Sequence, residues 1–304
     1  MVHQRIAARR FAPTWAEYEL IDSGGGRKLE RFGAYTIIRP EPQAKWSPAL
    51  LDGRWQAADA VFLPKVDART GEWKLLKPLP ARWKMRRAPL EIWVQLTPSG
   101  HVGVFPDQAC HWDWIAGLVA SAGNPLEILC AFGYTGLATL SAAAAGARVT
   151  HVDASHKAVK WARENQALSG LSNRPVRWIV DDAVQFVTRE ARRGHKYDAL
   201  ILDPPRFGRG PGGELWKVEE SLPLLLRRCR ELLSEAPRFV VLNTYMTVLT
   251  RVENERSERH LRRNLDELVS GYRAKITSGE LVVGDSAGRQ ISASVFARAV
   301  IGEK

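Results

Sequence analysis

A glycine turn and an acidic residue have the spacing that could hold a nucleoside. Residues 126–136 (LEILCAFGYTG) combine a short apolar run with a small-residue turn that contains Gly133 and Gly136, and a helix-forming stretch follows. Glycines let the backbone approach a ligand, and the new helix presents its free amides to it. Asp153 ends the next apolar run, 20 positions after Gly133. An acid at this position could bind the two hydroxyls of a ribose.

The same turn departs from the GxGxxG pattern of dinucleotide-binding proteins. Phe132 stands where a pyrophosphate-binding turn has a glycine, and its bulk argues against NAD or FAD. A ligand that contains adenosine without phosphates fits better, and S-adenosylmethionine is the common one. The alternative is an ordinary α/β turn that binds no ligand.

The stretch DPPRFGRG at residues 203–210 is the most specific signal in the chain. It follows a buried run at 197–202, and its two prolines fix the Asp203 carboxylate and leave carbonyls outside any helix, because proline has no N–H. Such acceptors suit a planar amine or a ring N–H beside a methyl donor, whereas the alternative is only a rigid strand exit. Arg206 and Arg209, among four glycines, predict a mobile basic loop that could admit a polyanion.

These residues need a parallel sheet to bring them together, because the carboxyl ends of parallel strands share one edge. We expect an α/β Rossmann-like fold that ends in an antiparallel hairpin. Asp182 follows the third strand and could hydrogen-bond an adenine amine, or Asp181 or Asp182 could cap the next helix. The expected strands are 126–129, 148–152, 176–180, 197–202 and 238–243, the hairpin is 280–283 with 291–300, and the main helices are 155–169, 214–233 and 251–269.

The first 103 residues predict a smaller β-rich, basic domain, followed by an α/β domain at 104–304. Six of the eleven tryptophans lie in this first part, where they could stack on unpaired bases or simply pack a small β core. RWKMRR at 82–87 lies between prolines, so we expect an exposed connection that contacts phosphates or is an ordinary solvated loop. SGHVGVF at 99–105 predicts a strand. FPDQ at 105–108 either closes over the adenosine side of a cofactor or only begins a helix.

Charge and composition limit the class of protein. The net charge is +11, and residues 1–104 hold 17 Lys and Arg against 10 Asp and Glu, which favours an RNA partner or serves solubility alone. No apolar run approaches a membrane span and no secretory segment follows the N-terminus, so we expect a soluble, cytoplasmic protein. Three widely spaced cysteines suit a reducing compartment and show no metal-binding pattern, and we expect no metal site.

Residues 104–304 resemble the class I S-adenosylmethionine-dependent methyltransferases, and within them the family of bacterial large-subunit ribosomal RNA methyltransferases. The motifs that carry the resemblance are CAFGYTG, HVDAS, DDA and LDPPRF. The resemblance implies a seven-stranded sheet ordered 3-2-1-4-5-7-6 with its last strand antiparallel. The first hundred residues are only loosely like the β-rich substrate-side domain of these enzymes.

The resemblance also implies roles for individual residues. The methionine and the ribose of the cofactor would contact residues 130–136. The ribose hydroxyls would bind to Asp153, and the adenine would lie near Asp182 and Ala183. The implied cofactor-binding residues are Cys130, Ala131, Phe132, Gly133, Tyr134, Thr135, Gly136, Asp153, Ala154, Ser155, Asp182, Ala183 and Asp203. The implied catalytic residues, beside the target base, are Asp203, Pro204, Pro205 and Arg206.

One departure from the family concerns cysteine. Relatives that methylate carbon 5 of cytosine attack carbon 6 with a cysteine after the fifth strand or in the Pro-Pro motif, where this chain reads LNTYMT and DPPRF. Methylation of a nitrogen or oxygen is therefore favoured. We expect direct methyl transfer to a base of ribosomal RNA, with Asp203 and the Pro204 carbonyl orienting the acceptor. The alternatives are a methyltransferase acting on protein or a small molecule, and a non-catalytic RNA-binding assembly factor.

Overall fold

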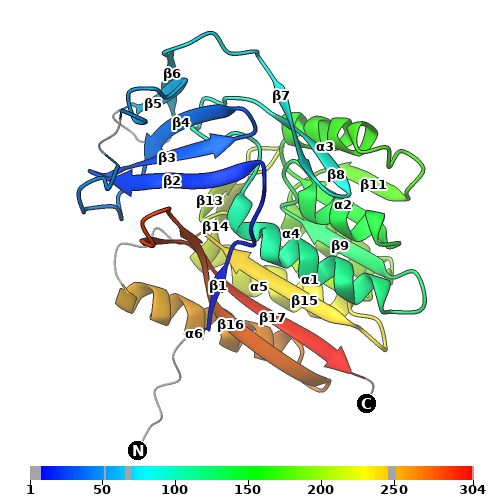
Figure 1. Cartoon of the computed structure of the whole chain (residues 1–304). Coiled ribbons are helices and arrows are strands. Elements are labelled where there is room, and N and C mark those ends of the chain that lie inside the picture. The colour runs from blue at the N-terminus through cyan, green and yellow to red at the C-terminus, as the bar shows by residue number, and fades with distance from the viewer. Residues whose placement is uncertain (1–7, 51–52, 66–69, 246–250, 303–304) are drawn as a thin grey trace, which may run out of the picture. The chain divides into compact units, whose positions relative to one another are not determined.

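The chain forms two compact units (Figure 1). The computed structural model describes residues 8–50, 53–65, 70–245 and 251–302. The α/β unit comprises the chain up to Arg10, Cys110–Leu281 and the chain from Ala293 onward. The β unit comprises Phe11–Ala109 and Val282–Ser292, so it includes the turn of the C-terminal hairpin as well as the N-terminal part.

The α/β unit is built on a mainly parallel sheet, as expected. Its order, from one edge, is β11-β10-β9-β12-β15-β17-β16-β1, which is the expected 3-2-1-4-5-7-6 order with β1 added beside β16. The described residues therefore give eight strands where we expected seven. The strands are β9 (Glu127–Ala131), β10 (Arg148–Asp153), β11 (Val176–Val180), β12 (Ala199–Leu202), β15 (Phe239–Thr244), β16 (Arg273–Gly284), β17 (Gln290–Gly302) and β1 (Ala8–Phe11).

The apolar character of both sheet faces explains why helices cover the two sides. The central strands are buried almost throughout, as expected for parallel strands between helices. β17 pairs antiparallel with β15, which confirms the terminal antiparallel hairpin. The helices are α1 (Ala109–Ala120), α2 (Leu137–Ala144), α3 (His156–Leu168), α4 (Ala183–Arg192), α5 (Val218–Leu232) and α6 (Arg251–Leu268).

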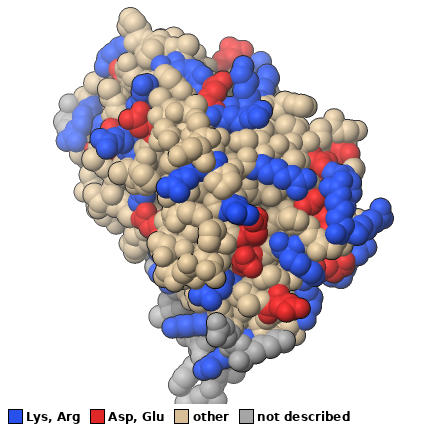
Figure 2. All heavy atoms as spheres, turned by 90° about the vertical axis from the view of Figure 1, so that its right-hand side faces the viewer, with Lys and Arg blue, Asp and Glu red and all other residues tan. Residues whose placement is uncertain are grey.

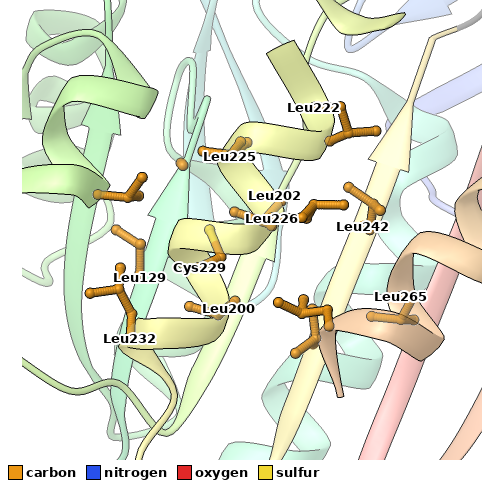
Figure 3. Packing of buried hydrophobic residues seen from close by; sticks show 14 of the residues in the cluster. Leu129, Leu200, Leu202, Leu222, Leu225, Leu226, Cys229, Leu232, Leu242 and Leu265 are labelled. Carbon is orange, nitrogen blue, oxygen red and sulfur yellow. The ribbon is translucent and has the colours of Figure 1, made fainter. Parts of the chain in front are cut away.

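The larger hydrophobic core lies on the side of the sheet covered by α4, α5 and α6. Leucines from α5 point between the strands in Figure 3, where Leu225 and Leu226 lie near Leu202 and Leu242. The opposite face packs against α1 and α2 through Ile115, among others. Burying a leucine side chain contributes about 2 kcal/mol, so these two cores fix the strands that end at the site.

Two expectations near residue 210 are wrong. The stretch after Asp203 is not a loop, because Phe207–Arg209 (β13) pairs antiparallel with Leu215–Lys217 (β14). The following helix therefore begins at Val218 rather than at residue 214. The physical reason is Trp216, whose buried ring anchors β14 while its neighbours point outward.

The β unit contains a five-stranded sheet and a separate two-stranded sheet. In the larger sheet β4 and β5 pair in parallel, whereas the other neighbours are antiparallel. The order is β2 (Tyr18–Gly24), β3 (Arg27–Phe32), β4 (Tyr35–Pro40), β5 (Ala60–Pro64) and β6 (Gly71–Leu75), and the smaller sheet is β7 (Trp83–Arg87) with β8 (Leu90–Val94).

The β unit corrects two further expectations. RWKMRR is not a connection, since it forms β7, with Trp83 and Met85 buried between outward-facing cations. SGHVGVF is not a strand, because it turns back on the chain through hydrogen bonds such as Thr97 N–H to His101 O at 3.1 Å. FPDQ holds a short 3-10 turn (Pro106–Gln108) directly before α1, so helix entry is confirmed.

The tryptophans of the β unit pack its interior. All six of those in the first 103 residues are buried or partly buried, and indole N–H groups donate to protein acceptors such as Phe32 O and Thr97 O. Trp55 donates to Asp22, a fully buried carboxylate that also pairs with Arg289 from the hairpin turn. This pattern supports the packing interpretation of these residues.

Candidate active site

The turn between β9 and α2 has an unusual backbone. Phe132 and Tyr134 have positive φ angles of 60° and 48°, and Gly136 has 87°. Positive φ is costly for residues with a Cβ, and such strain collects at ligand sites when the surroundings enforce it. Gly136 is the N-cap of α2 and offers no side-chain cap, so the first turn of this helix begins directly at the strained segment.

Gly133 lets this turn pack closely on β10. A Cβ at Gly133 would lie 2.4 Å from Cε1 of His151, so any larger residue would displace the turn or the ring. Burial lowers the pKa of His151 to about 3, and its Nδ1 lies 2.9 Å from the hydroxyl of Thr139. His151 is therefore uncharged at neutral pH, and its ring packs against the turn at Gly133.

Asp153 locks the turn in place. Its Oδ2 accepts from the amide of Tyr134 at 2.9 Å and its Oδ1 accepts from the amide of Ser155 at 2.9 Å. Burial raises the pKa of Asp153 above its ordinary value, although these two amides act in the opposite direction. Each carboxylate oxygen has a second lone pair, so the acid can hold the turn and still accept from a ligand hydroxyl.

The two acids after β11 have structural partners. Asp182 is the N-cap of α4 and accepts from the amide of Gln185 at 2.9 Å. Asp181 forms an ion pair with Arg189. The capping interpretation is therefore confirmed for Asp182, and Ala183 follows it as the buried first residue of α4. Only the remaining lone pairs of Asp182 are open to an adenine amine.

Asp203 is held by a chain of buried side chains from two other strands. Nδ2 of Asn243, at the end of β15, donates to Oδ1 of Asp203 at 2.7 Å. The hydroxyl of Ser294, in β17, donates to Oδ1 of Asn243 at 3.0 Å. Asn243 is 1% exposed and Ser294 is fully buried, so neither bond competes with water. This chain fixes the orientation of the Asp203 carboxylate.

The two proline carbonyls are also engaged. Pro204 O accepts from the hydroxyl of Thr244 at 3.2 Å, and Pro205 O accepts from the indole N–H of Trp216 at 2.6 Å. The ring of Trp216 lies 4.8 Å, centroid to centroid, from the ring of Phe132. The Asp-Pro-Pro segment and the strained turn are therefore joined through one buried aromatic pair.

Strand order explains how these groups meet. β9 lies between β10 and β12, and the Asp203 amide donates to Ala131 O at 3.4 Å. From β9 the chain runs to β10 and β11 on one side and then crosses to β12 and β15 on the other side. Open α/β sheets bind ligands at the carboxyl edge of such a switch point. The turn at 131–136, Asp153, Asp182 and Asp203 all lie on this edge.

Other candidate residues have different surroundings. Cys130 lies within β9. Ser155 is the N-cap of α3, and its hydroxyl accepts a hydrogen bond from the Ala158 amide. Arg206 lies 3.5 Å from the carboxylate of Glu219, so its charge is partly compensated. FPDQ at 105–108 belongs to the β unit, directly before α1.

Four residues that contact the Asp-Pro-Pro segment or support it were missed by sequence reasoning. Asn243 and Thr244 follow the carboxyl-end rule that identified the acids, and that rule would have found them. Trp216 and Ser294 carry no local signal, because their contacts depend on the β13–β14 pairing and on the register of β17.

None of the three cysteines offers a clear nucleophile. Burial raises the pKa of Cys130 to about 12 and that of Cys229 to about 12, so both thiols are protonated at neutral pH. Cys110 is a partly buried residue of α1 and is not in a disulfide. The chemistry that the edge offers is therefore hydrogen bonding and proton acceptance by fixed carboxylates and carbonyls.

No helix among the described residues is long and apolar enough to span a membrane. No group of three or more His, Cys, Asp or Glu in the same residues is arranged to hold a metal ion.

The chain is similar to known methyltransferases. No family model matches it. It is 34% identical over 119 residues to a ribosomal RNA large subunit methyltransferase K/L of Shewanella frigidimarina, a match that covers 38% of this chain and only 16% of that protein. A methyltransferase K/L of Methylococcus capsulatus is 34% identical over 117 residues, which is 15% of its length. The chain therefore spans a small part of these relatives.

Solved structures cover far more of the chain. A crystal structure solved with SAH, of the methyltransferase SMU.776, shares the fold at 17% identity with a TM-score of 0.66. The crystal structure of a SAM-dependent methyltransferase from Agrobacterium tumefaciens is 42% identical, with a TM-score of 0.90, and the match covers 97% of this chain and 94% of that one. On this similarity over nearly the full length of both chains, the protein belongs to the S-adenosylmethionine-dependent methyltransferases.

Proposed function

We propose that this protein transfers the methyl group of S-adenosylmethionine to a nitrogen or oxygen of a base in ribosomal RNA. The observation that carries the proposal is the carboxyl edge of the sheet, where Asp153 and the strained turn lie beside a fixed Asp203. The partial similarity to ribosomal RNA methyltransferases K/L supports RNA as the substrate. The positive net charge of +11 is consistent with a polyanionic partner.

The cofactor side of this edge is the turn at 130–136 with Asp153, Ala154, Ser155, Asp182 and Ala183. The nucleoside fits here because Asp153 retains acceptor capacity for ribose hydroxyls, and the start of α2 suits the methionine carboxylate. Phe132 and Tyr134 occupy positions of positive φ, and Phe132 stands where a pyrophosphate-binding turn has a glycine. When bound, the sulfonium supplies an activated methyl group.

The acceptor side comprises Asp203, Pro204, Pro205 and Arg206. Asp203 orients the acceptor and takes its proton when the attacking atom carries one. The carbonyl of Pro204 has a second lone pair beyond its bond to Thr244, and it is available to a base amine. Holding the nucleophile in line with the methyl group supplies much of the rate, because the donor is already activated.

The cysteines favour this route over carbon 5 methylation. That chemistry needs a thiolate near the target ring, and the thiols of Cys130 and Cys229 are buried with pKa values raised to about 12. Such relatives carry a cysteine after the fifth strand; here β15 ends with Asn243 and Thr244, which support the Asp-Pro-Pro segment, and residues 246–250 lie outside the described residues.

The test is transfer of labelled methyl from S-adenosylmethionine by the purified protein to deproteinised ribosomal RNA, total protein and a small-molecule extract. We expect label in the RNA fraction only, with none from the Asp203→Ala variant. Label in the protein fraction or the small-molecule fraction would show that the substrate belongs to that class and not to RNA. RNA retention without cofactor binding would instead indicate a non-catalytic assembly factor.

A further inference from the structure

The two-stranded sheet of the β unit has one buried face and one basic face. Trp83 and Met85 of β7 are 7% and 1% exposed, and they lie opposite Val94 and Ile92 of β8, which are buried as well. Side chains alternate along a strand, so the residues between them, Lys84 and Arg86, point the other way and are exposed.

Hydrogen bonds hold this sheet firmly to the rest of the β unit. The indole N–H of Trp83 donates to Phe32 O at 2.9 Å, and Arg86 O accepts from the indole N–H of Trp15 at 2.7 Å. The amide of Arg86 donates to the carboxylate of Glu17. These contacts use the backbone of Arg86 and leave its side chain pointing away from the core.

The outward face carries a concentrated positive charge. Lys84 and Arg86 of β7 are exposed on this side, whereas Arg87 follows on the side of Trp83 and Met85. Arg82 directly precedes the strand, and its Nε and Nη2 atoms are buried. β8 contributes one acid, Glu91, which lies opposite Arg86 in the register. Lysines and arginines are interspersed with acids over the face of the molecule in Figure 2, so the total charge does not single out a binding site.

Two of these cations are ordered by an aromatic ring. The guanidinium carbon of Arg82 lies 4.7 Å from the centroid of the partly buried Trp93 ring, and Nζ of Lys84 lies 5.5 Å from it. Cation–π contacts of this kind hold long side chains in place. Less side-chain entropy is then lost when a ligand binds, which raises affinity.

We propose that this basic surface, comprising Lys84, Arg86, Trp93 and the Arg82 side chain held over the Trp93 ring, binds the phosphate backbone of the RNA substrate. The proposal rests on the proposed RNA substrate and adds a binding surface on the β unit. Outward residues two positions apart on a strand are about 7 Å apart, close to the separation of neighbouring phosphates along an RNA strand. The surface thus offers a row of cations that matches a row of phosphates, without reading the base sequence.

The experiment compares the double variant K84Q/R86Q with the wild type and with K160Q/R163Q. The control removes one exposed Lys and one exposed Arg from α3, so the net charge of the two variants is the same. Binding to deproteinised bacterial large-subunit ribosomal RNA is measured over a series of salt concentrations. Cofactor affinity is measured by calorimetry, and the melting temperature shows that each variant is folded.

We expect K84Q/R86Q to bind RNA about tenfold more weakly at low salt. The slope of log affinity against log salt should fall by about 1.4, since each lost single-strand phosphate contact lowers it by about 0.7. The KM for RNA should rise while kcat at saturating RNA and cofactor affinity stay unchanged. The control should match the wild type.

Two results would overturn the proposal, and they are distinguishable. In the first, the wild type binds and methylates RNA, and K84Q/R86Q has the same RNA affinity and salt slope as the wild type. The proposed binding surface is then wrong, whereas RNA remains the substrate. If the wild type neither binds nor methylates RNA, both the surface and the substrate class fail.

Discussion

The cofactor side and the acceptor side of the sheet edge are built in different ways. On the cofactor side Asp153 accepts from backbone amides of Tyr134 and Ser155, which lie 19 and 2 positions away. On the acceptor side Asp203 is held by the side chain of Asn243, 40 positions away, and Asn243 by Ser294, a further 51 positions along. One side is a local backbone structure, whereas the other is assembled from distant side chains.

This difference implies that the two sides can be disabled separately. Changes on the acceptor side should affect methyl transfer and leave cofactor affinity intact. Changes on the cofactor side should lower the affinity for the cofactor, because we propose that the Asp153 carboxylate both binds the cofactor and fixes the turn. The four predictions below test this division, from the largest expected effect to the smallest.

Asp203→Ala should have the largest effect, on turnover alone. It removes the carboxylate that orients the acceptor, and we expect kcat to fall at least a hundredfold, in line with the loss of a positioned acid or base. Cofactor affinity measured by calorimetry should stay within twofold of the wild type. A fully active variant would show that the Asp-Pro-Pro segment has only a structural role.

Asp153→Ala should weaken cofactor binding. Loss of charged hydrogen bonds to the ribose costs about 1.5–3 kcal/mol, which corresponds to roughly a 10- to 100-fold rise in Kd. The same variant should lower the melting temperature, because the amides of Tyr134 and Ser155 lose their acceptor.

Asp153→Asn is the matched control for that change. It keeps one oxygen acceptor and the same volume, so its affinity should lie between those of the wild type and Asp153→Ala. Unchanged cofactor affinity in both variants would remove this residue from the binding site.

Asn243→Ala should reduce kcat by about tenfold with little change in cofactor affinity. It frees the Asp203 carboxylate to rotate and removes a hydrogen bond to a charged group worth about 2 kcal/mol. Ser294→Ala acts one bond further away, so its effect on kcat should be smaller and in the same direction. Equal loss of cofactor affinity and kcat in Asn243→Ala would contradict a separate acceptor side.

The pH dependence of cofactor binding should give the smallest effect. Burial raises the pKa of Asp153, and the ionised carboxylate is the acceptor for ribose hydroxyls. Affinity should therefore decline as pH falls through this raised pKa, at a higher pH than for an exposed aspartate. Calorimetric titrations of the wild type and Asp153→Asn should differ in this respect, since the amide does not titrate.

The contrast between the two sides also explains what the sequence could predict. The turn, the position of Asp153 at the end of a strand and the terminal hairpin follow from local periodicity and spacing, whereas the order of strands is what the family resemblance implies, and the structure confirms these features. The eighth strand was not predicted, because β1 is a short segment whose pairing with β16 depends on tertiary structure. The support of Asp203 was missed for the same reason, since Asn243 and Ser294 meet it only through strand order and register.

Two of the wrong local predictions have a common cause. RWKMRR and the glycine-rich stretch after Asp203 are rich in arginine, which suggests exposed loops. Both form strands, because single aromatic residues, Trp83 and Trp216, are buried on the inner side of each hairpin. Alternation with a period of two was present in both stretches and outweighs overall polarity as a signal.

The most direct test of the account is mass spectrometry of large-subunit ribosomal RNA nucleosides from cells that lack the gene. The cells are complemented with the wild-type gene or with Asp203→Ala. We predict that one methylated nucleoside disappears in the deletion strain, returns with the wild type and stays absent with Asp203→Ala. Identical nucleosides in all strains would contradict methyl transfer to a ribosomal RNA base at this edge of the sheet.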